Sequence, residues 1–82
     1  MIEIRLDDEA WTDVEEGTEA LLDEWSVRPG TVVQAGQTIA IVAMVKSTIE
    51  LESPVDGTVM RLLVEPQGNF ARGQVLAEIL PA

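Results

Sequence analysis

Hydrophobic and polar positions alternate along much of this chain, and glycine or proline interrupts the alternation at short intervals. The alternation is clear in MIEIRL at residues 1–6 and in residues 49–52, where Ile49 and Leu51 alternate with Glu50 and Glu52. A period of two residues is typical of β-strands, and turn signals roughly every 8–12 residues are typical of a β-sandwich or a flattened barrel. The pattern therefore predicts an all-β domain built from short strands.

The same pattern occurs twice in the chain. Residues 18–42 align with residues 55–79 at a constant offset of 37 positions, without a gap. Such a repeat predicts two similar units packed about an approximate twofold axis. The alternative is a chance alignment of glycine-rich turns and valine-rich strands, but the order and spacing of the shared residues favour a repeat. Five pairs are identical, namely Val27/Val64, Pro29/Pro66, Gly36/Gly73, Gln37/Gln74 and Ala40/Ala77.

Each repeat predicts a strand, a turn, a short strand, a second turn and a last strand. The strand segments are ALLDEWSV, VVQ and TIAIVA in the first repeat, and DGTVMRLLV, FA and VLAEIL in the second. The polar residues 7–18, which precede the first repeat, are predicted to form a loop. Glycine allows the positive φ that tight turns often need, so we expect four glycines to lie in turns. These are Gly30, Gly36, Gly57 and Gly73.

Aliphatic side chains are predicted to form the core, because 46% of the residues are hydrophobic but only 4% are aromatic. A chain of 82 residues is expected to make one small domain, residues 1–82, which removes about 60% of its unfolded surface from water. Trp25 is expected to be partly buried on a strand. The predicted core residues are Val32, Ile39, Ile41, Ile49, Leu51, Val59 and Leu76.

A single lysine, Lys46, lies between the two repeats, and the other four basic residues are all arginines. Local propensity alone predicts one continuous strand from Ile39 to Leu51, because VKS contains no Gly, Pro or Asn. Two short strands require a turn between them, and a type I turn at Met44–Ser47 is compatible with these residues. We therefore predict a hairpin with Lys46 at its tip.

The formal net charge is −10, from fifteen acidic and five basic residues. This charge repels phosphate backbones and anionic lipid headgroups, so neither nucleic acid nor a membrane is a predicted partner. Ten of the acidic residues lie within residues 1–24, where we interpret them as a solvated face; steering toward a basic partner is the alternative. No membrane-spanning run or targeting segment is recognisable, so a cytoplasmic location is expected.

Cysteine and histidine are both absent. Their absence removes the thiol nucleophile, the commonest general base and the commonest metal ligand. The acidic run at residues 7–9 lacks the spacing of a calcium-binding loop, and no glycine-rich phosphate-binding loop is present. The sequence therefore predicts neither catalytic residues nor a metal site. If this chain takes part in chemistry, we expect it to carry a group rather than to transform one.

Three features follow the pattern of a known family. EALLDEWSVRPGTVVQAGQTIAIV places a Trp-containing strand before a Pro-Gly turn and a Gly-Gln turn, and SPVDGTV at residues 53–59 matches an S-P-x-x-G-x-V segment. Lys46 lies 16 residues after Gly30 and 11 before Gly57, which is the spacing of the family's modified lysine. Over residues 17–80 the chain thus resembles the biotinyl/lipoyl carrier domains, most of all the lipoyl domains of 2-oxo acid dehydrogenase complex acyltransferases.

This resemblance implies a barrel-sandwich hybrid of two four-stranded antiparallel sheets related by a quasi-twofold. It implies that Lys46, flanked by Met44, Val45 and Ser47, lies at a hairpin tip and forms an amide with lipoate. The lipoyl arm would carry acyl groups and electrons between the subunits of a complex, and the domain would not be catalytic alone. The implied partners are a lipoyl ligase or lipoyltransferase, a thiamine-dependent 2-oxo acid dehydrogenase subunit, an acyltransferase core and dihydrolipoamide dehydrogenase.

The tip itself, Ala43-Met44-Val45-Lys46-Ser47, leaves alternatives open. Lipoyl domains of pyruvate and 2-oxoglutarate dehydrogenase complexes usually read close to E-T-D-K-A, and glycine-cleavage carriers read E-S-V-K-A. Biotin carriers read A-M-K-M, which Ala43-Met44 matches in part. The alternatives are therefore a biotin carrier domain of a carboxylase, with biotin on Lys46, or an unmodified interaction module of the same fold. Val45 is the residue that we expect to decide which partner loads Lys46.

Overall fold

A computed structural model describes residues 1–12, 14–15, 17–44 and 47–82. In these ranges the chain forms eight strands and one short 3-10 helix, within extents of 36 × 21 × 18 Å. None of the helical residues described belongs to a helix long and apolar enough to cross a bilayer. The elements are β1 (Ile2–Ile4), η1 (Asp8–Trp11), β2 (Ala20–Trp25), β3 (Val32–Val33), β4 (Thr38–Ala43), β5 (Thr48–Glu52), β6 (Gly57–Leu62), β7 (Asn69–Phe70) and β8 (Ala77–Pro81).

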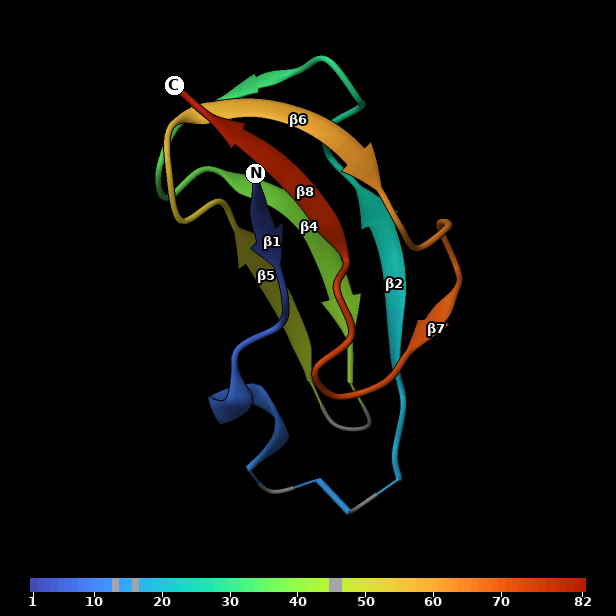
Figure 1. Ribbon diagram of the computed structural model, residues 1–82. Coiled ribbons are helices and arrows are strands. Elements are labelled where there is room, and N and C mark those ends of the chain that lie inside the picture. Colours follow the sequence, from blue (N-terminus) through green and yellow to red (C-terminus); the bar gives the residue numbers. More distant parts are fainter. Residues whose placement is uncertain (13, 16, 45–46) are drawn as a thin grey trace.

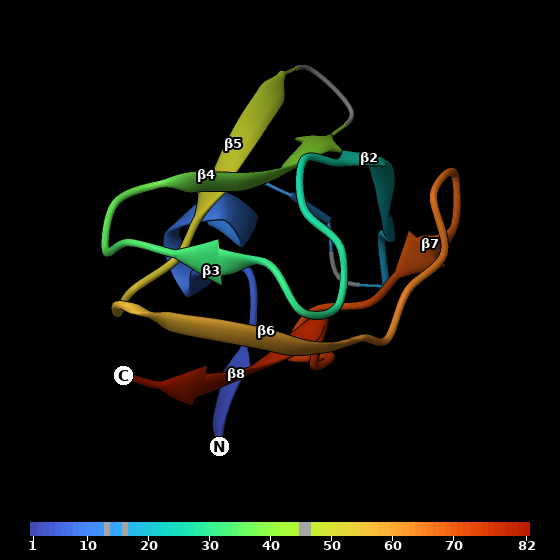
Figure 2. The same ribbon diagram turned by 90° about the horizontal axis from the view of Figure 1, so that it is seen from above.

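Two antiparallel four-stranded sheets stack face to face (Figure 1). Sheet A has the strand order β1-β8-β6-β3, and sheet B has the order β5-β4-β2-β7. Figure 2 shows the layers from above, with β2 and β4 on one side and β6 and β8 on the other. The two sheets remain separate rather than closing into one barrel. The predicted all-β sandwich of two four-stranded antiparallel sheets is therefore confirmed.

The two repeats fold alike and exchange their short strands. β2 and β6 start 37 residues apart, and so do β3 and β7. Because β3 pairs with β6 and β7 pairs with β2, each repeat completes the sheet of the other. Even the register shifts recur, between Leu22 and Glu24 on β2 and between Val59 and Arg61 on β6. The predicted repeat and its approximate twofold symmetry are confirmed.

Three of the four glycines that were predicted to lie in turns do lie in turns. Gly36 and Gly73 have φ values of 85° and 83°, and Gly30 has a φ of 95°. Gln67 takes the position of Gly30 in the second repeat and keeps a positive φ of 69°. Gly57 differs, because it is the first residue of β6, where a Cβ would clash with a backbone carbonyl of β8. The prediction of a turn residue was therefore wrong for Gly57, which instead permits close approach of two strands.

The core lies between the sheets and consists mainly of aliphatic side chains. Val32 was predicted to be buried but is 73% exposed, and Val33 is buried in its place. Adjacent strand residues point to opposite faces, and the pairing of β3 with β6 turns Val33 inward. Ile41 and Ile49 are only half-buried. The remaining predicted core residues, Ile39, Leu51, Val59 and Leu76, are buried as expected.

The segment before β2 contributes one aromatic side chain to the core. Trp11 on η1 is 3% exposed and meets Phe70 edge to face, with 6.1 Å between the ring centroids. The loop prediction for residues 7–18 was therefore wrong at η1, where one aromatic ring in a polar run closes an end of the core. Trp25 is half-buried on β2 as predicted, and its indole N–H donates to the carbonyl of Val64 at 2.8 Å.

Replacing Trp11 tests how strongly this segment is tied to the sandwich. Trp11→Ala should lower the free energy of unfolding by about 3 kcal/mol, because it removes a buried ring and leaves a cavity beside Phe70. Trp11→Phe is the matched control and should cost much less, since the indole N–H has no partner among the residues described. Urea unfolding followed by circular dichroism measures both. A loss below about 1 kcal/mol for Trp11→Ala would mean that the segment packs only peripherally.

Candidate functional site

The predicted site is the connection between β4 and β5. Lys46 and Val45 lie outside the described residues, as does the predicted type I turn itself, whereas Met44 and Ser47 are described. The Met44 amide donates to the Ser47 carbonyl at 2.8 Å, and the antiparallel register continues with Ala43 opposite Thr48. The prediction of two short strands joined by a hairpin is therefore confirmed, and the single continuous strand favoured by local propensity is wrong.

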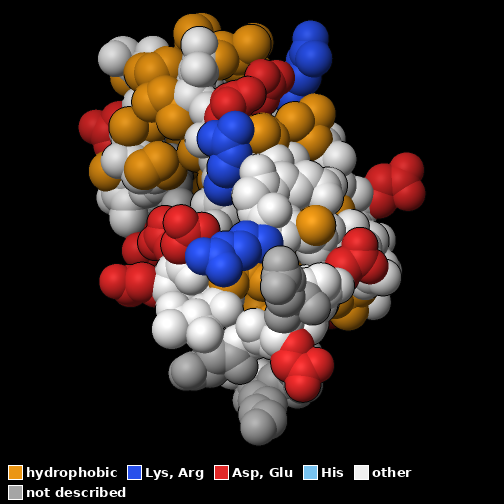
Figure 3. Space-filling view, turned by 60° about the horizontal axis from the view of Figure 1, so that its bottom comes forward, with side chains coloured by type: hydrophobic (Ala, Val, Ile, Leu, Met, Phe, Trp, Pro, Cys, Tyr) orange, Lys and Arg blue, Asp and Glu red, His pale blue; other side chains and the backbone are white. Residues whose placement is uncertain are grey.

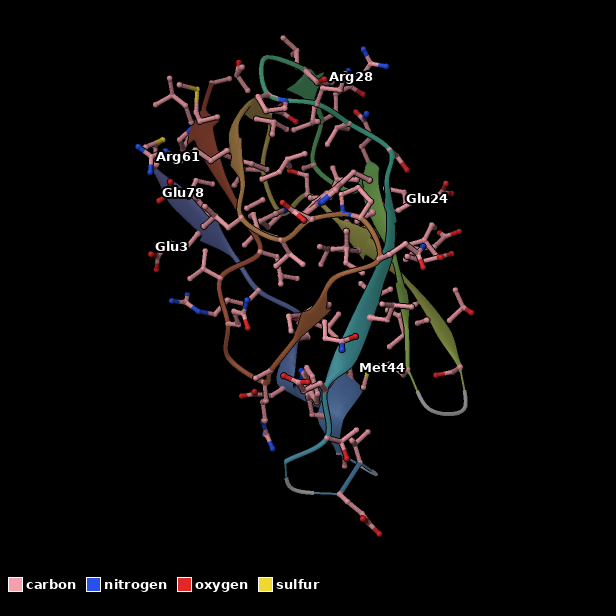
Figure 4. The ribbon with its side chains drawn as sticks, turned by 90° about the vertical axis from the view of Figure 1, so that its right-hand side faces the viewer. Glu3, Glu24, Arg28, Met44, Arg61 and Glu78 are labelled. Carbon is pink, nitrogen blue, oxygen red and sulfur yellow. The ribbon has the colours of Figure 1, made fainter. Side chains whose placement is uncertain are left out.

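The two described neighbours of the tip differ in their packing. Met44 is half-buried, and its side chain packs against the core at the end of β4 (Figure 4). Ser47 is exposed at the start of the returning strand. The long, flexible thioether side chain can fill an irregular edge of a core, so Met44 holds one side of the hairpin to the sandwich. The backbone hydrogen bond between Met44 and Ser47 then ties the second side to the first.

The end of the molecule that bears this hairpin is remote from the chain termini. In Figure 1 both termini lie at the top, and β4 ends and β5 begins at the bottom, near η1. The acidic residues around η1, Asp7, Asp8 and Glu9, are all exposed. Asp8 lies 3.3 Å from Arg72, but both side chains are well exposed, so this ion pair contributes little stability. These positions agree with the interpretation of the acidic run as a solvated face.

A groove lies on the flank of the sandwich, between β1 and β5, the edge strands of the two sheets. The hairpin is separate from this groove, because neither Met44 nor Ser47 lines it. The described residues contain no group of three or more Asp, Glu, His or Cys side chains suited to a metal ion. Among the described residues, Met44 and Ser47 thus lie apart from this groove, in an arrangement that can present a group on a hairpin.

One residue near this end was missed by sequence reasoning. The short helix η1, which carries the buried Trp11, lies on the side of the molecule where the hairpin lies (Figure 1), although most neighbours of Trp11 in sequence are polar. The available signal was an isolated large aromatic residue in an acidic segment, since such a residue is rarely left in water. Strand periodicity could not reveal it, because η1 is not a strand.

A known protein family and several known proteins match this chain over most of its length. A profile of the Biotin_lipoyl family, described as "Biotin-requiring enzyme", matches residues 12–79. The dihydrolipoyllysine-residue acetyltransferase component of the pyruvate dehydrogenase complex of Acholeplasma laidlawii is 38% identical over 70 residues, 84% of this chain and 13% of the relative. The dihydrolipoyllysine-residue succinyltransferase component of the mitochondrial 2-oxoglutarate dehydrogenase complex of Saccharomyces cerevisiae is 33% identical over 64 residues, 78% of this chain and 14% of the relative.

A third relative extends the comparison. The lipoamide acyltransferase component of the branched-chain alpha-keto acid dehydrogenase complex of Pseudomonas putida is 37% identical over 68 residues, 82% of this chain and 16% of the relative. The chain thus spans 13% to 16% of the length of these three relatives. The family match includes both repeats and the β4–β5 hairpin between them. On the profile match and these identities, the chain belongs to the biotinyl/lipoyl domain family.

Proposed function

We propose that residues 1–82 form a single lipoyl carrier domain, with lipoate attached to Lys46 through an amide. The arm would shuttle acyl groups and electrons between the subunits of a 2-oxo acid dehydrogenase-type complex. The observation that carries the proposal is the hydrogen bond of 2.8 Å between Met44 and Ser47, which closes two strands on either side of the chain's only lysine. The named relatives, all acyltransferase components of such complexes, support the same function.

The residues around the tip fit a covalently attached arm. An amide-linked group needs an amine presented on a firm support, and it needs no binding pocket. Met44 anchors the hairpin to the core, while Ser47 leaves the other side open to an approaching enzyme. When bound, lipoate supplies a disulfide that accepts an acyl group and two electrons. The protein's contribution is support, reach and recognition, so the domain is not catalytic alone.

The proposed partners follow from that cycle. A lipoyl ligase or lipoyltransferase would load Lys46, and a thiamine-dependent 2-oxo acid dehydrogenase subunit would supply the acyl group. An acyltransferase core would receive it, and dihydrolipoamide dehydrogenase would reoxidise the arm. The exposed carboxylates around η1 lie toward the hairpin end, so they would favour partners with basic surfaces there.

A biotin carrier domain of a carboxylase is the second candidate. The family description "Biotin-requiring enzyme" and the Ala43-Met44 pair before the lysine support it. Every named relative refers to a lipoyl group or to lipoamide, and this favours lipoate over biotin.

Modification of Lys46 can be measured directly by intact mass. Incubation with lipoate, ATP and a lipoyl ligase should add one lipoyl group, and Lys46→Arg should abolish the addition. A double variant, Lys46→Arg with Arg72→Lys, controls for position, because it restores one exposed lysine at a different turn and should stay unmodified. Addition of biotin by a biotin ligase, with no addition of lipoate by the lipoyl ligase, would show that the chain is a biotin carrier instead. If neither ligase modifies the chain, the unmodified interaction module is the remaining function.

The same Lys46→Arg variant separates a carrier role from a structural one. A lysine at an exposed tip contributes little to folding, so the free energy of unfolding should change by no more than about 0.5 kcal/mol. Urea unfolding of the unmodified proteins measures this. A loss several times larger would show that Lys46 supports the fold.

Val45 is the proposed determinant of the acyl donor. Val45→Asp restores the acid that precedes the lysine in pyruvate and 2-oxoglutarate dehydrogenase lipoyl domains. With the lipoylated proteins, we expect it to raise kcat/KM for reductive acylation by a pyruvate or 2-oxoglutarate dehydrogenase subunit several-fold. Val45→Asn is the control for size without charge and should have a smaller effect. Equal kcat/KM values for the unchanged protein, Val45→Asp and Val45→Asn would show that Val45 does not determine the acyl donor.

A further inference from the structure

The groove on the flank of the sandwich lies between the edges of the two sheets. On this flank β1 is the last strand of sheet A and β5 is the last strand of sheet B, and residues of η1 line the groove near the start of β5 (Figure 1). The groove has a volume of about 870 Å³, within the range of roughly 300–1,000 Å³ that is usual for ligand sites. The apolar part of its lining consists of Ile4, Leu6, Ala10, Ile49 and Leu51.

The backbone of β5 has hydrogen-bonding groups that point into the open edge. The Met44 amide donates to the Ser47 carbonyl, so these two residues form a hydrogen-bonded pair of the ladder. In an antiparallel ladder every second pair is of this type, and Ile49 is therefore the next residue of β5 that bonds to β4. The amides and carbonyls of Thr48 and Glu50 point the other way. In the part of the chain that the structure describes, β5 pairs with β4 alone.

Carboxylates dominate the charged lining of the groove. Its single basic side chain, Arg5, is already engaged, because Nη2 lies 2.8 Å from Glu3 and Nε donates to the Gly73 carbonyl at 3.0 Å. Figure 3 shows red side chains gathered on the left of the molecule, the side on which Figure 1 shows β1, β5 and η1. The remaining carboxylates of the groove form no ion pair with a described arginine; they are Asp7, Glu9, Glu50 and Glu52.

These charges decide what can cover the edge. An open strand edge is a template for another chain, and charged side chains on it disfavour unsuitable strands. A second copy of this chain has a net charge of −10 and would place carboxylates opposite carboxylates. A strand with basic side chains is attracted instead. The side chains of β5 alternate, with Glu50 and Glu52 exposed and Ile49 and Leu51 turned toward the sandwich.

From these observations we propose that the groove binds an extended segment of a partner protein, which adds to β5 as an antiparallel strand. The segment carries basic residues at alternate positions and apolar residues between them. Paired residues point to the same face of a sheet, so the basic side chains lie beside Glu50 and Glu52 and the apolar ones lie over the groove. The free backbone groups of β5 supply the main-chain hydrogen bonds. The proposal is independent of any attached lipoyl or biotinyl group.

A short peptide tests this mode of docking. The probe is acetyl-Thr-Lys-Val-Lys-Val-Thr-amide, titrated into the isotope-labelled domain and followed by NMR. Amide resonances of β5 and β1 should shift, with a Kd on the order of 0.1–1 mM at low salt. Raising NaCl to about 0.5 M should weaken binding about tenfold, because salt screens the charges. The same peptide with Glu in place of both Lys residues should not bind. Equal binding of the two peptides, or shifts confined to other strands, would overturn the proposal.

Methylation of the peptide backbone separates strand addition from attraction by charge alone. Methylating the two lysine amides removes the N–H groups that face β5 and should weaken binding more than about tenfold. Methylating the two valine amides is the matched control, because these N–H groups face away from β5, and it should change Kd less than about threefold. Equal effects of the two methylated peptides would show that the segment does not pair with β5.

Two double variants of the protein locate the contact. Glu50→Gln with Glu52→Gln should weaken binding of the lysine peptide about tenfold, and glutamine still accepts the Thr38 hydroxyl bond of Glu50. Glu24→Gln with Glu65→Gln is the matched control, because it changes the net charge equally at exposed positions outside the groove. It should change Kd less than about twofold. An equal loss of binding in both double variants would refute the groove as the docking site.

Discussion

The crossed pairing of β3 with β6 and of β7 with β2 joins the two repeats, and the rest of the structure depends on it. The Gly30 amide donates to the Val59 carbonyl at 2.7 Å, and the Gln67 amide donates to the Leu22 carbonyl at the same distance. These bonds pass from one repeat to the other, so neither repeat completes its sheet alone. The inward side chains of both repeats then share one core.

This constraint also distinguishes the two ends of the molecule. By register, β1 takes the place in sheet A that β5 takes in sheet B, because Ile2 faces Ile79 as Ile49 faces Val42. At one end, β4 and β5 are consecutive strands of a hairpin. At the pseudo-equivalent end, the paired strands are β8 and β1, which are not consecutive in the chain. The hairpin between the consecutive strands β4 and β5 contains the single lysine.

The two halves share a backbone plan but not a surface. Since a sheet can be covered or left open on its outer face, residues there are free to vary without loss of the core. Sheet B carries unbalanced carboxylates, whereas sheet A carries balanced charges and the exposed side chains of Val32, Met60 and Leu80. The division gives one small domain two chemically distinct faces and a separate hairpin. The internal symmetry relates strands of sheet A to strands of sheet B, so the residues on the two sheets can be compared position by position.

The sequence by itself determined the all-β class, the repeat, three of the four turn glycines and the candidate lysine, because spacing and periodicity are local properties. Between Ile39 and Leu51 it predicted a hairpin, although local propensity alone favoured one continuous strand because no turn-forming residue marks the break; the pairing of β4 with β5 in sheet B decided for the hairpin. It could not determine that Val33 rather than Val32 faces the core, or that Trp11 is buried. A period of two fixes alternation but not which face is inward; contact with strands distant in sequence decides that.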